Sequence, residues 1–462
     1  MRLILLSGGA GKRLWPLSNT NRPKQFLPVL RHEGKAESML QRVCRQLTDV
    51  GLAEALLFSA GLGQKELIQG QVGDLAPILE EPERRDTFPA ISLASVYLHS
   101  KEGCDPDEIV GVLPVDGYAE DSFFQALAKL PGVLAGAGAD LALLGVAPDA
   151  PADKFGYIVT QQPAEADGSM RVRAFVEKPS AARAQTLIDE GALWNCGVFV
   201  FRLGFLLDGL KQRGLPADYD ELFGMYKQLP RQSFDIEVVE RTKHIVAVPY
   251  QGRWKDIGTW NSLSEEMEQQ VSGSGYVCPD SSGSRIVNEL DIPVGVWRVP
   301  NIVVAAGPDG ILVTDREAST GIKDMVDQVE ITPRFKETWW GRKTVLTARQ
   351  AGETESVTNR AVISAGRFIG YHEHERRKEI WIVIAGAGEA CIDGQPFPVE
   401  AGSVVVVEPG MKHALLAYSD LELIELQIGL KIEDSDIIRY AAPWMAKEGK
   451  GEEQNHEVPA RR

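Results

Sequence analysis

The first residues place the strongest constraint on the fold, because an apolar strand runs directly into a glycine-rich loop. "RLILL" occupies residues 2–6 and "SGGAG" occupies residues 7–11. Four cations follow closely: Lys12, Arg13, Arg22 and Lys24. Because glycine has no Cβ, backbone N–H groups in such a loop can approach phosphate oxygens. The segment is typical of an α/β domain that binds phosphate beyond the carboxyl end of a buried strand.

Two common phosphate-binding motifs do not match this loop. The Walker motif requires glycine at position 6 and Ser or Thr after Lys12, where the chain has Leu6 and Arg13. The dinucleotide fingerprint requires a third glycine at the position of Leu14. A cationic loop suited to a triphosphate or a leaving pyrophosphate remains, with a solvated turn and incidental charges as the alternative.

The pattern beyond the loop predicts an α/β domain followed by β-rich segments. The predicted strands are "RLILL", "ALLFSA", "EIVGVLPVD" and "LALLGVAP", and the predicted helices cover residues 38–47 and 87–100. This alternation favours a doubly wound, Rossmann-like and mainly parallel sheet. Composition and glycine turns divide the chain into a first domain over 1–265, a β-rich connector over 266–332, an all-β domain over 333–446 and a disordered tail over 447–462.

The net charge indicates which binding partners are unfavourable, and the cysteine content indicates the cellular compartment. The 462 residues carry a formal net charge of −16, which argues against nucleic acid and against anionic membranes as partners. The five cysteines show no paired spacing, which is typical of free thiols in a reducing compartment. No signal peptide or membrane-spanning apolar stretch is evident, so we expect a cytoplasmic protein. A homo-oligomer is an open alternative.

Two aspartates are candidate ligands for a hard cation. Asp116 ends the strand in "VLPVDGY", and Asp256 lies in "RWKDIGTW". Carboxylate oxygens suit Mg²⁺, which neutralises phosphate charge when two anions must approach each other. Each aspartate taken singly is equally well explained as a turn or cap residue.

The C-terminal half contains a histidine pattern typical of a metal site in a β-barrel. His372, His374 and Glu379 lie in "GYHEHERRKEIW", and His413 ends "GSVVVVEPGMKH". The two histidines of an extended H-x-H segment face the same side, so neighbouring strands can complete the set. Three imidazoles and one carboxylate suit a divalent transition metal such as Zn²⁺.

The ordered motifs resemble those of the mannose-1-phosphate guanylyltransferases, a branch of the sugar nucleotidyltransferases. The N-terminal resemblance covers Gly8, Gly9, Gly11, residues 13–18 and residues 23–26. Further matching segments, in order, are "EPERRDTFPAI", "LPVD", "FGYIV", "FVEKP", "WNCGVFVF" and "WKDIGTW". Asp86 replaces the family's asparagine.

The resemblance implies in-line transfer of GMP from GTP to mannose-1-phosphate, with Mg²⁺ as cofactor. It implies that Arg13 contacts the leaving pyrophosphate, that Lys24 lies near the α-phosphate, and that Asp116 and Asp256 bind Mg²⁺. The residues that it implies for binding the nucleotide are Ser7, Gly8, Gly9, Gly11, Arg13 and Arg85. Those that it implies for binding the sugar phosphate are Gly156, Glu177, Lys178 and Asn195.

The histidine pattern is that of a cupin, and it resembles the isomerase half of bifunctional mannose-6-phosphate isomerase/guanylyltransferases. Ile380 replaces a histidine of that family, and "ALLA" at 414–417 replaces a polar set, whereas Arg377 and Trp381 are kept. We therefore expect a metal site with weak or no isomerase activity. Full bifunctionality, and a cupin that only binds a ligand or mediates oligomerisation, are the alternatives.

Overall fold

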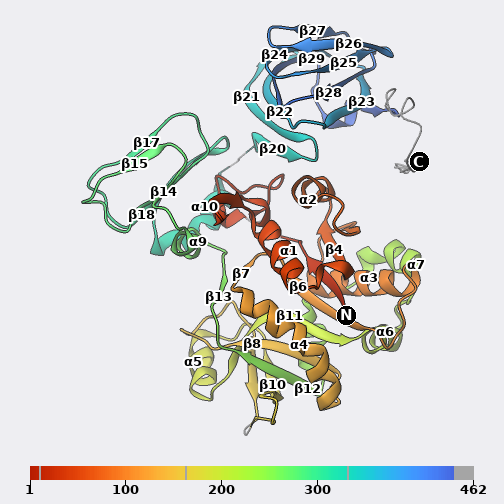
Figure 1. The fold of residues 1–462 in the computed structure, drawn as a ribbon, viewed down its shortest axis with the longest axis vertical. Helices are drawn as coiled ribbons and strands as arrows, with labels where there is room; N and C mark the ends of the chain where they lie inside the picture. Colours follow the sequence, from red (N-terminus) through yellow and green to blue (C-terminus); the bar gives the residue numbers. More distant parts are fainter. Residues whose placement is uncertain (10–11, 162–163, 330–331, 442–462) are drawn as a thin grey trace. The chain divides into compact units, whose positions relative to one another are not determined.

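The computed structural model describes residues 1–9, 12–161, 164–329 and 332–441, and it separates into two compact units (Figure 1). The first unit is Met1–Pro333 and the second is Arg334–Arg462. The strands of the expected connector belong to the first unit. Gly11 and the tail over 447–462 lie outside the described residues.

A nine-stranded sheet forms the centre of the first unit, in the order β5-β4-β1-β6-β11-β8-β12-β10-β9. These strands are β1 (Arg2–Leu6), β4 (Leu56–Gly61), β5 (Ile78–Glu81), β6 (Ile109–Pro114), β8 (Leu141–Val146), β9 (Tyr157–Thr160), β10 (Met170–Val176), β11 (Leu193–Arg202) and β12 (Ile245–Tyr250). Strands β5, β4, β1 and β6 run parallel, and β11 is antiparallel to both β6 and β8. The four predicted strands are confirmed, and β4 and β8 are buried at every residue, as their continuous apolar runs indicated.

Helices cover both faces of this sheet, because alternate residues of its strands enter two different hydrophobic cores. In β1, Ile4 packs with α3 and α6, whereas Leu3 and Leu5 pack with α1 and α4. The helices of the unit are α1 (Met39–Asp49), α2 (Lys65–Val72), α3 (Thr87–Ser100), α4 (Asp121–Ala137), α5 (Ala181–Asp189), α6 (Leu203–Gln212), α7 (Tyr219–Gly224), α8 (Phe234–Glu237), α9 (Trp260–Glu266) and α10 (Ile322–Gln328). The doubly wound arrangement expected from the sequence is confirmed.

Small β elements complete the first unit. Two antiparallel pairs lie outside the large sheet: the hairpin of β2 (Leu30–His32) with β3 (Lys35–Glu37), and the pair of β7 (Gly117–Ala119) with β13 (Trp254–Asp256), which are far apart in the chain. The later strands are β14 (Val271–Ser272), β15 (Gly275–Val277), β16 (Arg285–Asn288), β17 (Val294–Val296), β18 (Ile302–Gly307) and β19 (Gly310–Asp315). Strand β18 packs against the N-terminal loop region, since Val303 and Ala305 share a core with Leu14 and Leu17.

The second unit is a β-barrel of two antiparallel sheets. One sheet contains β20 (Phe335–Thr338), β21 (Gly341–Ala351), β22 (Thr354–Ile363), β29 (Leu421–Gly429), β24 (Arg377–Ala385) and β27 (Val404–Val407). The other contains β26 (Gln395–Glu400), β25 (Ala387–Ile392), β28 (His413–Ala417), β23 (Phe368–His374) and β30 (Ile437–Arg439). Inward residues such as Trp381 and Leu415 form its core.

The five cysteines are free and buried: Cys44, Cys104, Cys196, Cys278 and Cys391. A search of the described residues finds no helix with the length and apolar character needed to cross a membrane.

Candidate active site and metal centre

The N-terminal loop begins at the carboxyl end of β1, inside the sheet. The N–H of Val115 donates to the carbonyl of Leu6 at 3.1 Å, which ties the end of β1 to the end of β6. The side chain of Gln25 donates to the carbonyl of Ser7 and holds the start of the loop. At Gly9 φ is 159°, close to extended backbone. The loop is therefore anchored by the sheet, as a phosphate site at the carboxyl ends of strands requires.

Lys24 joins the two predicted metal-binding aspartates. Its Nζ lies 3.0 Å from Asp116 Oδ2 and 3.4 Å from Asp256 Oδ1. The carboxylates meet because β7 pairs with β13, which sets Asp256 opposite Gly117, the residue after Asp116. Two carboxylates separated by 140 positions in the chain thus face one cation beside the glycine loop.

The charges of this cluster stabilise one another. Burial lowers the pKa of Lys24, but the charges of Asp116 and Asp256 outweigh it and raise the pKa above its ordinary value. Burial raises the pKa of Asp256, and Lys24 with Lys154 more than compensates, so that pKa is lowered. Lys154 Nζ lies 3.3 Å from the other oxygen of Asp256. Lys24 and Asp256 are therefore both charged at neutral pH.

Three of the four predicted sugar-phosphate residues line one cavity of about 170 Å³, whose lining does not include Lys178. Gly156, Glu177 and Asn195 lie in its wall, together with Lys154 and Asp235. The N–H of Asn195 donates to the carbonyl of Gly156 at 2.8 Å, which connects β11 to the loop before β9. Carboxylates and an amide in a small cavity next to two cationic lysines suit a ligand that carries hydroxyl groups at one end and phosphate at the other.

Two local features of this cavity explain its residue types. A Cβ on Gly156 would lie 2.6 Å from Glu177 Oε2 and 2.6 Å from the Phe175 ring, so only glycine allows this approach. Lys178 adopts a left-handed φ of 43°, unusual for a residue with a long side chain. Its Nζ pairs with Glu177 Oε1 at 2.6 Å. Backbone strain of this kind concentrates at functional sites.

The two predicted arginines differ in placement. Arg13 lies exposed at the end of the glycine loop, available to an incoming anion. Arg85 donates instead to the backbone carbonyls of Tyr226 and Lys227. Within the described chain no hydrogen bond or ion pair joins Arg85 to the other predicted site residues. Its predicted contact with the nucleotide gains no support from this geometry.

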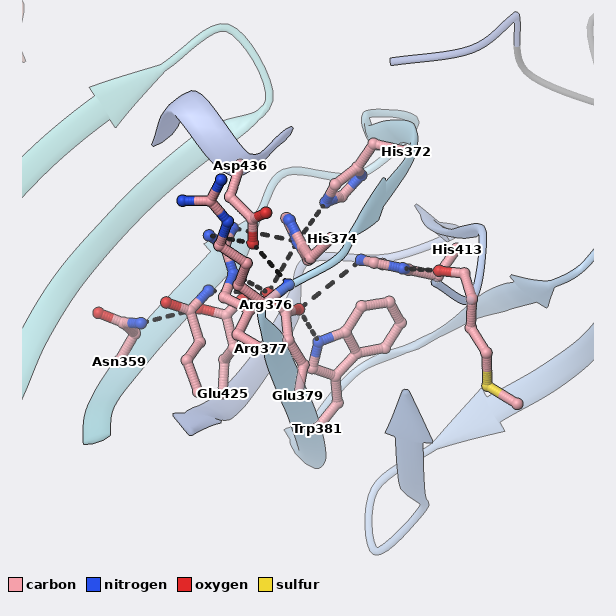
Figure 2. Close-up of polar contacts among 12 residues, drawn as sticks. Asn359, His372, His374, Arg376, Arg377, Glu379, Trp381, His413, Glu425 and Asp436 are labelled. Atoms are coloured by element: carbon pink, nitrogen blue, oxygen red, sulfur yellow. Dashed lines mark hydrogen bonds and ion pairs between the residues drawn. The ribbon is translucent and has the colours of Figure 1, made fainter. Parts of the chain in front are cut away.

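In the second unit, the three predicted histidines converge inside the barrel (Figure 2). The ligand atoms of His372, His374 and His413 lie within 4.8 Å of one another. Pairing of β23 with β28 places His372 directly opposite His413. The fourth predicted ligand is Glu379 on β24, whose Oε1 lies 3.0 Å from His374 Nε2 and whose Oε2 lies 3.8 Å from His413 Nε2.

Hydrogen bonds to the backbone orient two of these imidazoles. The Nδ1–H of His372 donates to the carbonyl of Gly370 at 2.6 Å, and that of His413 donates to the carbonyl of Met411 at 2.8 Å. Each Nε2 is then unprotonated and free to donate a lone pair to a metal. Burial and the neighbouring His413 lower the pKa of His372 to about 3, so this imidazole stays neutral.

Polar groups packed around Glu379 keep it charged. Trp381 Nε1 donates to its Oε2 at 3.1 Å, and Gln427 donates to its Oε1 at 2.8 Å. Arg377, buried beside it, donates to the same oxygen at 3.3 Å (Figure 2). Burial would raise the pKa of Glu379, but the hydrogen bond and charge of His374 hold it well below the usual range.

Ile380, which the sequence analysis expected to alter this site, does not face it. Ile380 lies between the inward-facing residues Glu379 and Trp381 on β24, so its side chain points to the opposite face. Its replacement of a histidine therefore does not change the pocket. In "ALLA", by contrast, Leu415 and Ala417 face inward and belong to the barrel core.

Three further residues at these sites had no role assigned from the sequence. Lys154 precedes the matched segment "FGYIV", and Asp235 lies in "SFDIE", where no motif was recognised. Glu81 begins "EPERRD", and its Oε1 would lie 3.6 Å from a Cβ on Gly8. Their spacing in the chain gives no periodic pattern, and only the folded chain brings them to the sites.

Comparison with known proteins agrees with this architecture. The nucleotidyl transferase family matches residues 2–272, and the cupin domain family matches residues 359–427. The xanthan biosynthesis protein XanB of Xanthomonas campestris is 30% identical over 95% of this chain and 97% of its own length. A mannose-1-phosphate guanylyltransferase of Escherichia coli is 29% identical over 95% of this chain and 97% of its own length.

A solved structure matches most of the chain. It is described as a mannose-1-phosphate geranyltransferase from Thermus thermophilus, and it is 30% identical with a TM-score of 0.61. The alignment covers 71% of this chain and 99% of that one. The chain therefore belongs to the nucleotidyl transferase family, within the group that joins this domain to a C-terminal cupin and that includes curated mannose-1-phosphate guanylyltransferases.

Proposed function

We propose that this protein transfers GMP from GTP to mannose-1-phosphate and releases pyrophosphate. The observation that carries the proposal is the cluster in which Lys24 contacts both Asp116 and Asp256 beside the N-terminal glycine loop. A cavity lined by Gly156, Glu177 and Asn195 lies next to it, joined through Lys154. The relatives named mannose-1-phosphate guanylyltransferases support the choice of both substrates.

The chemistry requires positioning and charge neutralisation rather than a covalent protein intermediate. An oxygen of the sugar phosphate attacks the α-phosphorus of GTP, and the bond from that phosphorus to the β-phosphate oxygen breaks. Lys24 is placed to hold the α-phosphate, and exposed Arg13 to receive the departing pyrophosphate. Lys154 and Lys178 would hold the attacking phosphate, while Glu177 and Asn195 bind hydroxyl groups of the sugar.

Asp116 and Asp256 fit a Mg²⁺ ion, because the two carboxylates, one directly before β7 and the other at the end of β13, face the same point. When bound, Mg²⁺ neutralises phosphate oxygens at the reacting centre. Asp116 and Asp256 would hold the Mg²⁺ ion at the carboxyl ends of the strands, beside the glycine loop.

The test is a matrix of nucleoside triphosphates against sugar 1-phosphates, followed by pyrophosphate release. We expect the pair GTP and mannose-1-phosphate to give the highest turnover. Asp116→Ala and Arg13→Ala should each lower turnover by roughly two orders of magnitude or more, since both act on developing phosphate charge. Asp140→Ala is the control, because this carboxylate pairs with His244 at the other end of β8. Near wild-type turnover of Asp116→Ala with saturating Mg²⁺ would overturn its role.

For the cupin we propose a single divalent transition metal held by His372, His374, His413 and Glu379. The residues fit such an ion, since His413 Nε2 is buried and has no hydrogen-bond partner within the described chain. The donor set of imidazoles and a carboxylate suits Zn²⁺ and similar ions. A bound ion would supply a Lewis acid and would cross-link the two sheets of the barrel.

The isomerase alternative receives less support from the geometry. Isomerisation of a sugar phosphate needs cationic groups that hold the phosphate. Arg377 is buried and already bonded to His374, Glu379 and the carbonyl of Glu433. Arg376 is the exposed cation that remains beside the site.

Two measurements test the cupin proposal. Elemental analysis should find about one divalent ion per chain in the wild type and none in the double variant His372→Ala/His374→Ala. His244→Ala, a substitution of an exposed histidine in the other unit, should leave the metal content unchanged. A coupled assay from mannose-6-phosphate to fructose-6-phosphate should show little turnover. Robust turnover that the double variant abolishes would favour the bifunctional alternative.

A further inference from the structure

We propose that Asp235 determines specificity in the cavity lined by Gly156, Glu177 and Asn195, called here the sugar cavity. One oxygen of its carboxylate fixes Asn195, and the other accepts a hydrogen bond from a hydroxyl group of the sugar. This inference rests on the proposed transfer to mannose-1-phosphate. Asp235 lines the same cavity as Gly156 and Glu177.

The orientation of Asn195 depends on Asp235. Asn195 Nδ2 donates to Asp235 Oδ1 at 2.6 Å, and Asn195 Oδ1 accepts from the N–H of Gly197 at 3.1 Å. The amide is thus held at both ends, and one of the two lone pairs of its oxygen is already used inside the protein. A sugar hydroxyl that donates a hydrogen bond therefore finds stronger acceptors in the carboxylates of this wall.

The free acceptors of the cavity are carboxylate oxygens. Among the described residues no other side chain donates to the second oxygen of Asp235. The side chain of Glu177 is only 8% exposed and contributes a second carboxylate to the same cavity. Two carboxylates side by side are costly unless donors approach them, and the hydroxyl groups of a sugar are such donors.

The electrostatics of the cavity agree with this interpretation. Burial, with the nearby charge of Glu177, raises the pKa of Asp235 to about 7. Lys178 pairs with Glu177 and opposes this effect, but the pKa of Asp235 remains raised. A carboxyl group with a strongly raised pKa in a cleft is common at functional sites.

The backbone beneath Asp235 is rigid. The segment begins at Ser233, whose side chain accepts from the N–H of Ile236 at 3.3 Å. The N–H of Phe234 donates to Thr87 Oγ1 at 2.8 Å, which ties α8 to the start of α3. Phe234 is fully buried against Phe199. Asp235 is therefore held in place before the ligand arrives, which reduces the entropy cost of binding.

Steady-state kinetics of Asp235→Asn in the full-length protein test the proposal. The KM for mannose-1-phosphate should rise by roughly 10-fold or more, the effect of losing a hydrogen bond to a charged group. The KM for GTP and the melting temperature should stay close to wild type. Asp208→Asn is the matched control, because Asp208 is exposed on α6 and pairs with Lys211. An unchanged KM for mannose-1-phosphate would overturn the proposal.

Deoxy substrates separate a direct contact from a merely structural role. The four monodeoxy analogues of mannose-1-phosphate are compared in the wild type and in Asp235→Asn. Removing the hydroxyl that Asp235 binds should be costly in the wild type and nearly neutral in the variant. Equal losses for every analogue in both proteins would show that Asp235 acts only through packing, which contradicts the proposal.

Direct titration of mannose-1-phosphate distinguishes this proposal from the proposed reaction. If the wild type binds the sugar phosphate but transfers no nucleotide, the reaction is wrong, and weaker binding by Asp235→Asn still supports the role of Asp235. If both proteins bind equally well, the role of Asp235 is wrong even when the reaction is observed. If the wild type binds no sugar phosphate, both the proposed reaction and the proposed role of Asp235 are wrong.

Discussion

At the scale of single residues, the nucleotide site depends on charges that balance one another. Lys24 contacts both Asp116 and Asp256, and Lys154 contacts Asp256 from the other side. Opposite charges at these distances keep Lys24 and Asp256 ionised despite burial. The site is therefore built in the charged state that phosphate chemistry needs.

Lys24→Met should strengthen Mg²⁺ binding in the absence of nucleotide while lowering turnover. The substitution removes the ammonium group that competes with a cation for Asp116 and Asp256, but it also removes the contact proposed for the α-phosphate. The measurement is the rise in melting temperature with Mg²⁺ concentration, which should exceed that of the wild type. Lys154→Met, which frees Asp256 alone, should give a smaller gain. Loss of the Mg²⁺ response in Lys24→Met would contradict this account.

Glu81→Gln should flatten the pH dependence of stability of the first unit. Burial raises the pKa of Glu81 to about 7 in the folded chain, against about 4.3 in an unfolded chain. Between these values the folded state binds more protons, so the stability of the wild type falls as pH rises from about 5 to about 7. The variant lacks this titration and should gain stability relative to the wild type at pH 8. Thermal melts at pH 5 and pH 8 measure it, with exposed Glu54→Gln as control.

At the scale of secondary structure elements, the sites lie where regular pairing is interrupted. β11 shifts register between Asn195 and Phe199, and this irregularity turns Asn195 toward the sugar cavity. β7 and β13 lie outside the large sheet and pair with each other, which brings Asp116 and Asp256 together. Irregular positions of this kind redirect side chains that a continuous strand would place on alternate faces.

Gly156→Ala should raise the KM for mannose-1-phosphate by about 10-fold or more with a small effect on the KM for GTP. The added Cβ would lie 2.6 Å from Glu177 Oε2 and would displace that carboxylate from the cavity. Pyrophosphate release at varied sugar phosphate concentration measures the effect. Gly136→Ala in α4, where nothing lies within 4 Å of the added Cβ, should leave both KM values unchanged. Equal KM values in Gly156→Ala and wild type would contradict the role of this approach.

At the scale of the whole molecule, the two units carry separate sites. The transferase residues belong to Met1–Pro333, and the histidine site belongs to Arg334–Arg462. Each unit has its own hydrophobic cores. Each therefore meets the requirement for folding as an independent domain.

A fragment of residues 1–333 should fold and release pyrophosphate from GTP and mannose-1-phosphate without the cupin. The expected turnover is within a few-fold of the full chain, since no described transferase residue lies beyond Pro333. Circular dichroism and cooperative melting check folding, and the pyrophosphate assay checks activity. A folded fragment without activity would show that the cupin contributes to the transferase site.

Much of the local structure could be predicted from the sequence. β1, β4, β6, β8, α1 and α3 follow apolar patterns that depend only on nearby residues. The histidine set was recognisable because an H-x-H segment on a strand places both imidazoles on one face. The pairing of Asp116 with Asp256 was inferred by resemblance, since 140 residues separate them.

The remaining features were decided by the tertiary structure. Asp235 reaches the sugar cavity only because α8 is tied to α3 by the hydrogen bond between Phe234 and Thr87. Arg85 donates hydrogen bonds to the carbonyls of Tyr226 and Lys227, and no pattern in the sequence near Arg85 predicts these contacts. Hydrophobic periodicity determines which face of an element is buried, so the sequence by itself determined the elements and their layers. Contacts between segments far apart in the chain depend on how those layers pack, and only the folded structure decides them.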